Sequence, residues 1–227
     1  TESLPVAVLG SHEILQDTWP LTEQGKGVCV GRPVPIVDVK VIGITDEGIS
    51  KWDESLCVPQ GEVGEIVVKG PVVTQAYFND GENTGLAKIE DIDGIRHRMG
   101  DLGYFDTQGR LWFCGRKSHR VILSQQTLFT IPCEGIFNAH PDIYRTALVG
   151  AGSGDNRKPV LCIELEAASA NADQSEILGA LKKLAQKHSH TSGIETFLFH
   201  PSFPVDIRHN AKIGREKLSV WAAGQLG

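Results

Sequence analysis

The pattern of hydrophobic residues changes near residue 117, and this change limits the folds open to the chain. Before it, short alternating segments are separated by Gly and Pro, which is typical of β-strands joined by turns. Segments 34–44, 64–70 and 103–115 show this most clearly. Residues 106–109 (DTQG) are a turn sequence, so 103–115 is predicted to be a β-hairpin. This part is predicted to form a small barrel or a distorted sheet.

From residue 118 onward, helical and strand-like patterns alternate. Residues 132–140 begin with a proline that suits the first turn of a helix. Segments 144–150, 158–166 and 196–200 have the composition of strands. Asp173 is expected to cap a second helix whose apolar residues recur at helical spacing. These residues are Ile177, Leu178, Leu181, Leu184 and Ala185. This part is predicted to be a small α+β domain, and the fold class of the whole chain is α+β.

Composition limits the possible settings and partners. The 227 residues carry a net charge of −6, which argues against general nucleic-acid binding because that needs a basic face. No apolar run is long enough to form a transmembrane segment, and the start does not resemble a signal peptide. The five cysteines are scattered without a CxxC pair, so neither zinc nor a disulfide framework is predicted. Cys114 and Cys162 are expected to be buried in strands, and a reducing cytoplasm is the expected location.

The segment RHNAKIGREKL (208–218) fits an amphipathic terminal helix on spacing alone. One face of this helix would meet a core and the other would meet water. The core face would carry Ile213, Leu218 and Trp221, and the solvent face would carry Arg215, Glu216 and Lys217.

Four stretches in fixed order resemble the adenylate-forming superfamily, which contains acyl-CoA synthetases, luciferases and the adenylation domains of peptide synthetases. They are GEVGEIVVKGPVVTQAYFND (61–80), HRMGDLGYFDTQGRLWFCGRK (97–117), the block 132–150, and KIGREKL (212–218). The resemblance implies a large N-terminal domain followed by a small mobile one. It assigns residues 1–117 to the C-terminal portion of the large domain and 118–227 to the small lid domain. Because the family's phosphate-binding loop would precede residue 1, these residues alone are expected to be inactive.

By this resemblance, Lys212 is the catalytic lysine. The family activates a carboxylate by its attack on the α-phosphate of ATP, so two anions must meet while charge develops on phosphate oxygens. A fixed ammonium that bridges carboxylate and phosphate would stabilise that charge and orient the reactants. Lysine suits this role because it is a compact charge on a long side chain.

The resemblance also assigns the nucleotide-binding residues. Asp101 would accept hydrogen bonds from the two ribose hydroxyls, and Arg116 would help to hold the ribose. Thr1 would contact phosphate, and Glu2 would help to hold Mg²⁺, so ATP and Mg²⁺ are the expected cofactors. Ser118 occupies the hinge position, where the family usually carries Asp or Lys; a small residue can absorb a backbone rotation.

Two departures narrow the resemblance to one subgroup. Gln125 and Gln126 stand where acyl-CoA synthetases have a glycine-rich turn that lets the pantetheine arm pass, which favours loss of CoA use. FPVDIRHNAK (203–212) replaces the usual lead-in to the lysine. Three stretches together are similar to the AMP-forming β-lactone synthetases of bacterial olefin biosynthesis: HRMGDLGYFD (97–106), RLWFCGRKSHRV (110–121) and FPVDIRHNAKIGREKL (203–218). The substrate implied is a long-chain β-hydroxy fatty acid whose own hydroxyl displaces AMP and closes a lactone.

Lactone closure could need a group that accepts the hydroxyl proton. Four histidines lie near the motifs: His97, His119, His200 and His209. His209, three residues before Lys212, is the preferred candidate, although a histidine near a motif is more often structural or exposed to solvent.

Two alternatives remain open. A conventional long-chain acyl-CoA synthetase would differ only in the second half-reaction, and Gln125 and Gln126 argue against it. A non-catalytic docking module is the alternative from another class, and the joint presence of Asp101, Arg116 and Lys212 argues against that. The resemblance further implies a possible multienzyme complex with other proteins of the olefin pathway.

Overall fold

The computed structural model describes residues 2–152, 157–206 and 209–227, and it divides into two compact units. The first contains the chain up to Pro20 together with Gly27–Ser118, and the second contains Leu21–Lys26 and His119–Gly227. The division falls one residue after the boundary expected at 117. The segment Leu21–Lys26 belongs to the second unit because it packs closely against Gly135. The carbonyl oxygen of Thr22 lies 2.5 Å from the position that a Cβ at Gly135 would take, so there is no room for a side chain there.

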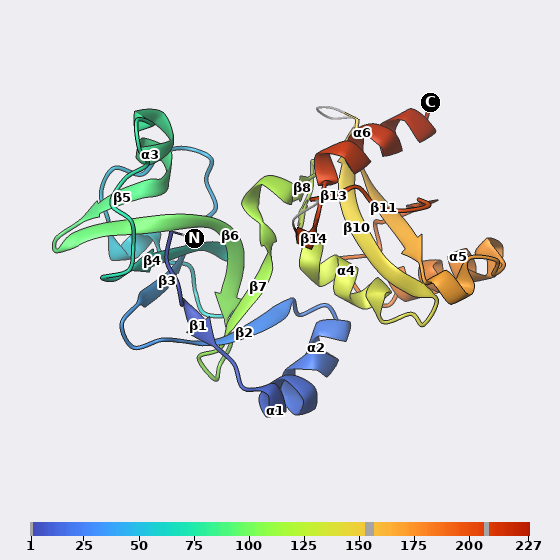
Figure 1. Cartoon of the computed structure of the whole chain (residues 1–227), viewed down its shortest axis with the longest axis horizontal. Helices are drawn as coiled ribbons and strands as arrows, with labels where there is room; N and C mark the ends of the chain where they lie inside the picture. Colours follow the sequence, from blue (N-terminus) through green and yellow to red (C-terminus); the bar gives the residue numbers. More distant parts are fainter. Residues whose placement is uncertain (1, 153–156, 207–208) are drawn as a thin grey trace. The chain divides into compact units, whose positions relative to one another are not determined.

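The first unit is built on an antiparallel sheet in the order β1-β2-β7-β6-β4-β3, with β5 also paired to β6 (Figure 1). The seven strands are β1 (Ala7–Val8), β2 (Val28–Pro33), β3 (Asp38–Ile42), β4 (Gly64–Lys69), β5 (Lys88–Asp91), β6 (Gly94–Phe105) and β7 (Leu111–Arg116). The helical segments are α1 (Ser11–Glu13), a π-helical turn (Ile14–Thr18), a 3-10 turn (Glu54–Leu56) and α3 (Gly81–Ala87). Helix α2 (Trp19–Glu23) crosses the division after Pro20, so most of it belongs to the second unit.

Both faces of strand β4 are buried, which explains its unbroken apolar run. Ile66 and Val68 point into one cluster with Val39 and Val41 of β3. Val67 points into a second cluster on the opposite face, as successive residues of a strand do. The strand predicted at 64–70 is therefore confirmed, and it lies inside the sheet.

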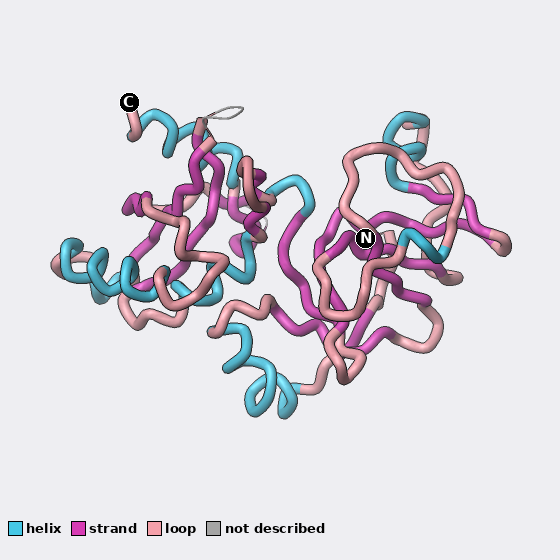
Figure 2. The backbone as a smooth tube through the Cα atoms, turned by 180° about the vertical axis from the view of Figure 1, so that it is seen from behind, coloured by secondary structure: helices cyan, strands magenta, loops and turns pink. Residues whose placement is uncertain are grey.

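The second unit has a three-stranded sheet in the order β10-β11-β12, with β10 and β11 antiparallel and β11 and β12 parallel. Figure 2 shows these strands between helices. The strands are β10 (Ile143–Ala151), β11 (Lys158–Leu165) and β12 (Thr196–Phe199). The helical segments are a 3-10 turn (Lys117–His119) at the division, α4 (Thr130–Asn138), a 3-10 turn (Ala167–Ser169), α5 (Gln174–Ala185) and α6 (Arg215–Gln225). In two further antiparallel pairs, β8 (Val121–Ile122) pairs with β9 (Thr127–Leu128), and β13 (Val205–Asp206) pairs with β14 (His209–Ile213).

Residues of β10 and β11 alternate between two apolar cores. The core beneath α4 and α5 includes Leu148, Leu161, Ile163, Phe137, Ile177 and Leu181. The core beneath α6 includes Ala147, Val149, Val160, Cys162, Leu218 and Ala222. Helices therefore cover both faces of this sheet.

Several local predictions are confirmed. Strands β6 and β7 form the predicted hairpin, and the Asp106 carboxylate accepts hydrogen bonds from the backbone N–H groups of Gln108 and Arg110 in its turn. Asp173 caps α5 by accepting from the Ser175 N–H at 2.8 Å. Cys114 and Cys162 are fully buried in strands, where burial raises the pKa of each thiol to about 12, and all five cysteines are free.

The terminal segment differs from the amphipathic helix that its spacing suggests. Helix α6 begins only at Arg215, and Lys212 lies before it in strand β14. Leu218 is buried, and Ile213 and Trp221 pack beside it, so the predicted apolar face is confirmed. Arg215 does not sit in water: its side chain is 11% exposed because it pairs with a buried carboxylate.

Candidate functional site

The RMGDLG motif forms a bulge in strand β6. Strand β4 pairs Glu65 with Leu102 and Val67 with Arg98, so the single residue Ile66 stands opposite residues 99–101. Gly100 has a φ of 64°, a conformation that a residue with a Cβ rarely adopts. A bulge of this kind re-aims the side chains that it carries. Asp101 thereby leaves the pairing with β4.

Asp101 instead pairs with Arg116 of β7. The Nη1 atom of Arg116 lies 3.1 Å from Oδ1 of Asp101 and donates to the Met99 carbonyl at 3.2 Å. The Asp101 side chain is 20% exposed and that of Arg116 is 56% exposed. Burial raises the pKa of Asp101, and the Arg116 guanidinium opposes that change. The two residues expected to bind a ribose are therefore adjacent, and the arginine remains accessible.

Both residues line a cavity of about 650 Å³ in the first unit, together with Glu2, Tyr77 and His97. The backbone carbonyl of Glu2 accepts from the Thr74 N–H at 3.0 Å, which ties this segment to the sheet unit. A backbone hydrogen bond lowers the pKa of the Glu2 carboxyl, so it is ionised at neutral pH. Thr1, the residue expected to contact phosphate, lies outside the described residues.

Glu2 is suited to be one ligand of a magnesium ion and not a whole site. Among residues 2–152, 157–206 and 209–227, no group of three or more His, Cys, Asp or Glu side chains could hold a metal. Protein Mg²⁺ sites in phosphate chemistry commonly use one or two carboxylates and take further ligands from substrate phosphates and water. The donor set therefore fits a metal that arrives with a nucleotide.

His97 is the histidine that the structure places in the same cavity as Asp101 and Arg116. It is 2% exposed, and its Nδ1 donates to the Ala87 carbonyl at 3.2 Å. Burial, and then the charge of Lys88, lower the pKa of His97, so the ring is neutral. With its proton on Nδ1, the ring leaves Nε2 able to accept one.

The other three candidate histidines, His119, His200 and His209, belong to the second unit. His119 Nε2 lies 3.5 Å from a Glu216 carboxylate oxygen, and the His200 ring packs edge-on against Trp221 at 4.6 Å between centroids. His209, the preferred proton acceptor from the sequence, lies in strand β14, and its side chain is outside the described part of the structure.

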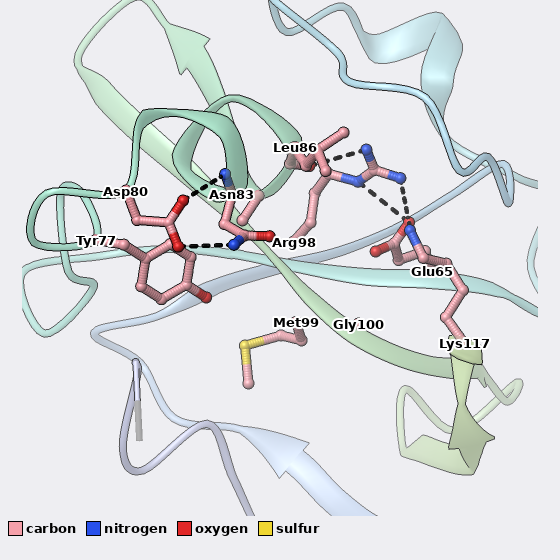
Figure 3. A pocket seen from close by; sticks show the side chains of 10 residues that line it. Glu65, Tyr77, Asp80, Asn83, Leu86, Arg98, Met99, Gly100 and Lys117 are labelled. Atoms are coloured by element: carbon pink, nitrogen blue, oxygen red, sulfur yellow. Dashed lines mark hydrogen bonds and ion pairs between the residues drawn. The ribbon is translucent and has the colours of Figure 1, made fainter. Parts of the chain in front are cut away.

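Beside the cavity lies a buried cluster of charged side chains that the sequence did not predict: Glu65, Arg98 and Lys117 (Figure 3). One carboxylate oxygen of Glu65 accepts from Arg98 Nη2 at 2.6 Å, from Arg98 Nε at 3.1 Å and from Lys117 Nζ at 3.1 Å. The carbonyl of Thr45 accepts from both Arg98 and Lys117. The glutamate is 1% exposed and lines a recess of about 340 Å³. The cluster fixes β6 just before the bulge and β7 just after Arg116.

Ser118 immediately follows this anchored lysine. It is exposed in a 3-10 turn at the division between the two units. Lys117 is tied into the first unit, and Val121 is buried in the core of the second. A residue with no core contacts between two such anchors can absorb a backbone rotation.

Lys212 belongs to the second unit, next to the last residue of β14, and it is exposed. Ile213 after it packs against the core beneath α6, and the Gly214 N–H donates to the Pro204 carbonyl at 2.7 Å. The lysine therefore projects from a backbone that is held on its C-terminal side.

Gln125 and Gln126 lie in the turn of the β8–β9 hairpin, and both are exposed. The Leu123 N–H donates to the Gln126 carbonyl at 2.9 Å and closes the turn. The segment is thus an ordinary hairpin turn with side chains of full length at its tip.

Comparison with known proteins reveals close relatives, although no family model matches the chain. It is 50% identical to an olefin β-lactone synthetase of Xanthomonas campestris over 99% of its length, and 48% identical to one of Stenotrophomonas maltophilia over its full length. The structure resembles an amide bond synthetase from Marinactinospora thermotolerans with a TM-score of 0.67 and 26% identity, covering 85% of this chain and 36% of that one. The chain spans 41% of the length of each of the two curated relatives. In the described part of the chain, no helix is long and apolar enough to cross a membrane.

Proposed function

Because the chain belongs to the adenylate-forming superfamily, we propose that it is the C-terminal part of an AMP-forming enzyme that converts a long-chain β-hydroxy carboxylic acid into a β-lactone. The observation that carries this proposal is the Asp101–Arg116 pair in one cavity with Glu2, in a chain about half identical to olefin β-lactone synthetases. The proposed activity is that of a whole enzyme, and the chain spans 41% of the length of each curated relative.

In the first half-reaction, a carboxylate oxygen of the acid attacks the α-phosphorus of ATP and pyrophosphate leaves. Asp101 would accept hydrogen bonds from the vicinal ribose hydroxyls, and Arg116 would hold the same sugar from the neighbouring strand. Glu2 would help to hold Mg²⁺, which supplies charge neutralisation on the phosphates when bound. Lys212 would bridge the two anionic reactants and stabilise the charge that develops between them.

In the second half-reaction, the β-hydroxyl oxygen attacks the acyl carbon of the adenylate. The bond from that carbon to the AMP oxygen breaks, AMP leaves with the electron pair, and the hydroxyl proton passes to a base. The nucleophile is already part of the substrate, so it acts at a high effective concentration without CoA. His209 is the candidate base suggested by its place before Lys212 in the sequence. His97 is a second candidate, because it is a neutral imidazole that lines the cavity.

The test uses the whole enzyme that contains these residues, with ATP, Mg²⁺ and a β-hydroxy fatty acid, in the presence and absence of CoA. We expect pyrophosphate release, AMP, and an acyl product lighter than the acid by one water, all indifferent to CoA. A CoA thioester as the product would instead identify an acyl-CoA synthetase, and the interpretation of Gln125 and Gln126 would be wrong.

The lysine needs its own control. Lys212→Ala should abolish pyrophosphate release, whereas Lys217→Ala, which removes an exposed lysine of α6, should leave it unchanged. Equal activity in the two variants would remove Lys212 from the mechanism.

A further inference from the structure

The C-terminal side of the Lys212 strand is held by a buried ion pair. Arg215, three residues after the lysine, directs its guanidinium at Glu134 of α4 with Nη1 at 2.5 Å from Oε1 and Nη2 at 2.9 Å from Oε2. Two parallel bonds of this kind fix the orientation of the arginine as well as its distance. Glu134 is only 4% exposed.

The same pair is bonded to β10, an edge strand of the three-stranded sheet. The Leu148 N–H in β10 donates to Glu134 Oε1 at 2.7 Å, and Arg215 Nη1 also donates to the Leu148 carbonyl at 3.3 Å. One residue of β10 thus uses both of its backbone polar groups on the pair. The junction between β14 and α6 is thereby tied to the edge strand β10 and to α4 together.

Helix α6 is held to the sheet without this pair. Its residues Leu218 and Ala222 are fully buried against the sheet, and the Ser219 hydroxyl donates to the Gly150 carbonyl at 2.6 Å. Because these contacts already hold the body of the helix, the added effect of the ion pair lies at its first residue. That residue is the one nearest to Lys212.

We propose that Glu134 is a positioning residue for Lys212: through the bidentate pair with Arg215 and the bond to Leu148, it fixes the C-terminal end of the lysine strand against β10 and α4. This inference rests on the proposed role of Lys212 in adenylation. A glutamine at position 134 can still accept from Leu148, but it turns an amide N–H₂ toward the guanidinium, so the second bond is lost. A lysine at position 215 keeps the charge but has no fork.

The first experiment measures ATP–pyrophosphate exchange in the whole enzyme for Glu134→Gln and Arg215→Lys. We expect kcat to fall at least about tenfold in Glu134→Gln, which corresponds to about 1.4 kcal/mol of lost transition-state stabilisation. The KM for ATP should change by less than about twofold, because a displaced lysine weakens the transition state and not nucleotide binding. Arg215→Lys, which keeps an ion pair, should lie between wild type and Glu134→Gln.

The matched control is Leu181→Ala, which destabilises the same unit from the opposite face of the sheet. Leu181 is a fully buried residue of α5 and is not in the cluster that supports α6. Below its unfolding temperature this variant should keep wild-type kcat. If Glu134→Gln loses no more kcat than Leu181→Ala, the pair is merely structural and the inference is overturned.

A second readout does not depend on catalysis. In the 227-residue chain, amide hydrogen exchange at Lys212 and Ile213 should be at least about tenfold faster in Glu134→Gln than in Leu181→Ala, because the strand end is released locally. Unchanged exchange there would also overturn the inference. Full pyrophosphate exchange by Lys212→Ala would instead contradict the proposed function, whatever the Glu134 variants do.

Discussion

Lys117 directs its ammonium to the buried carboxylate of Glu65 at 3.1 Å (Figure 3), although the next residue, Ser118, is exposed. Lys117, the residue just before the proposed hinge at Ser118, is therefore held by a carboxylate that is almost completely buried. A rotation about the hinge would begin at Ser118, and Arg116 on the other side of Lys117 would keep its place beside Asp101.

Lys117→Met tests how firmly this end is held. Glu65 would keep its bonds to Arg98, so the chain should still fold. Loss of one charged hydrogen bond should lower the free energy of unfolding by about 1.5 to 3 kcal/mol. The control Lys40→Met removes an exposed ion pair to Glu54, and it should leave the free energy of unfolding nearly unchanged because water screens that pair. Urea denaturation of the two variants measures the difference, and equal values would show that the Glu65 cluster contributes no anchoring.

Asp101→Ala tests the ribose site in the whole enzyme. Because hydrogen bonds to a charged group contribute about 1.5 to 3 kcal/mol, the Kd for AMP should rise by roughly tenfold to a hundredfold. Asp93→Asn, an exposed aspartate in the turn before β6, should leave the Kd unchanged. Isothermal titration calorimetry measures both, and wild-type affinity in Asp101→Ala would exclude the proposed contact.

Gly100→Ala tests the bulge that presents Asp101. A Cβ at Gly100 meets no atom within 4 Å, so the cost is the backbone conformation alone, at φ 64°. Left-handed backbone costs a residue with a Cβ about 1 to 2 kcal/mol, and we expect that loss of unfolding free energy. Gly43→Ala also meets no atom within 4 Å but has no positive φ, so it should be neutral or slightly stabilising. Thermal denaturation measures both variants, and equal Tm values would show that the backbone at Gly100 imposes no strain on alanine.

His97 makes the stability of the first unit depend on pH. Its pKa is lowered in the folded chain, so below about pH 6.5 the unfolded chain binds a proton that the folded chain does not. The stabilisation is complete above that pH and is lost progressively as pH falls toward the folded pKa. His97→Gln should therefore show a smaller fall in Tm between about pH 7.5 and about pH 5.5 than wild type. The exposed His12→Gln serves as the control and should keep the wild-type slope.

Local structure was predictable wherever neighbours in the sequence suffice to form it. The turn at 106–109 contains its own hydrogen-bonding aspartate, and Asp173 caps a helix that begins at the next residue. The composition of 144–150 and 158–166 predicted strands, and β10 and β11 occupy these positions. The order of motifs predicted the family, and the comparisons confirm it.

Long-range partners were not predictable in this way. Glu65 and Lys117 are separated by 52 residues, and Glu134 and Arg215 by 81. Each pair meets only because strands and helices bring distant segments together. Spacing assigned Arg215 to solvent because a charged residue in an amphipathic pattern normally faces water, and the buried carboxylate that reverses this preference lies in another helix.

The sequence by itself thus determined the element types, the α+β class, the family and the identity of Asp101, Arg116 and Lys212 as candidate site residues. The tertiary structure decided that Asp101 lies against Arg116 in one cavity and that Lys212 lies in a strand and not in a helix. It also decided that Glu65 holds Lys117 and that Glu134 holds Arg215. The physical reason is the range of the forces involved. Turns, caps and periodicity depend on residues a few positions apart, whereas burial of a charge becomes favourable only when its partner arrives from elsewhere in the fold.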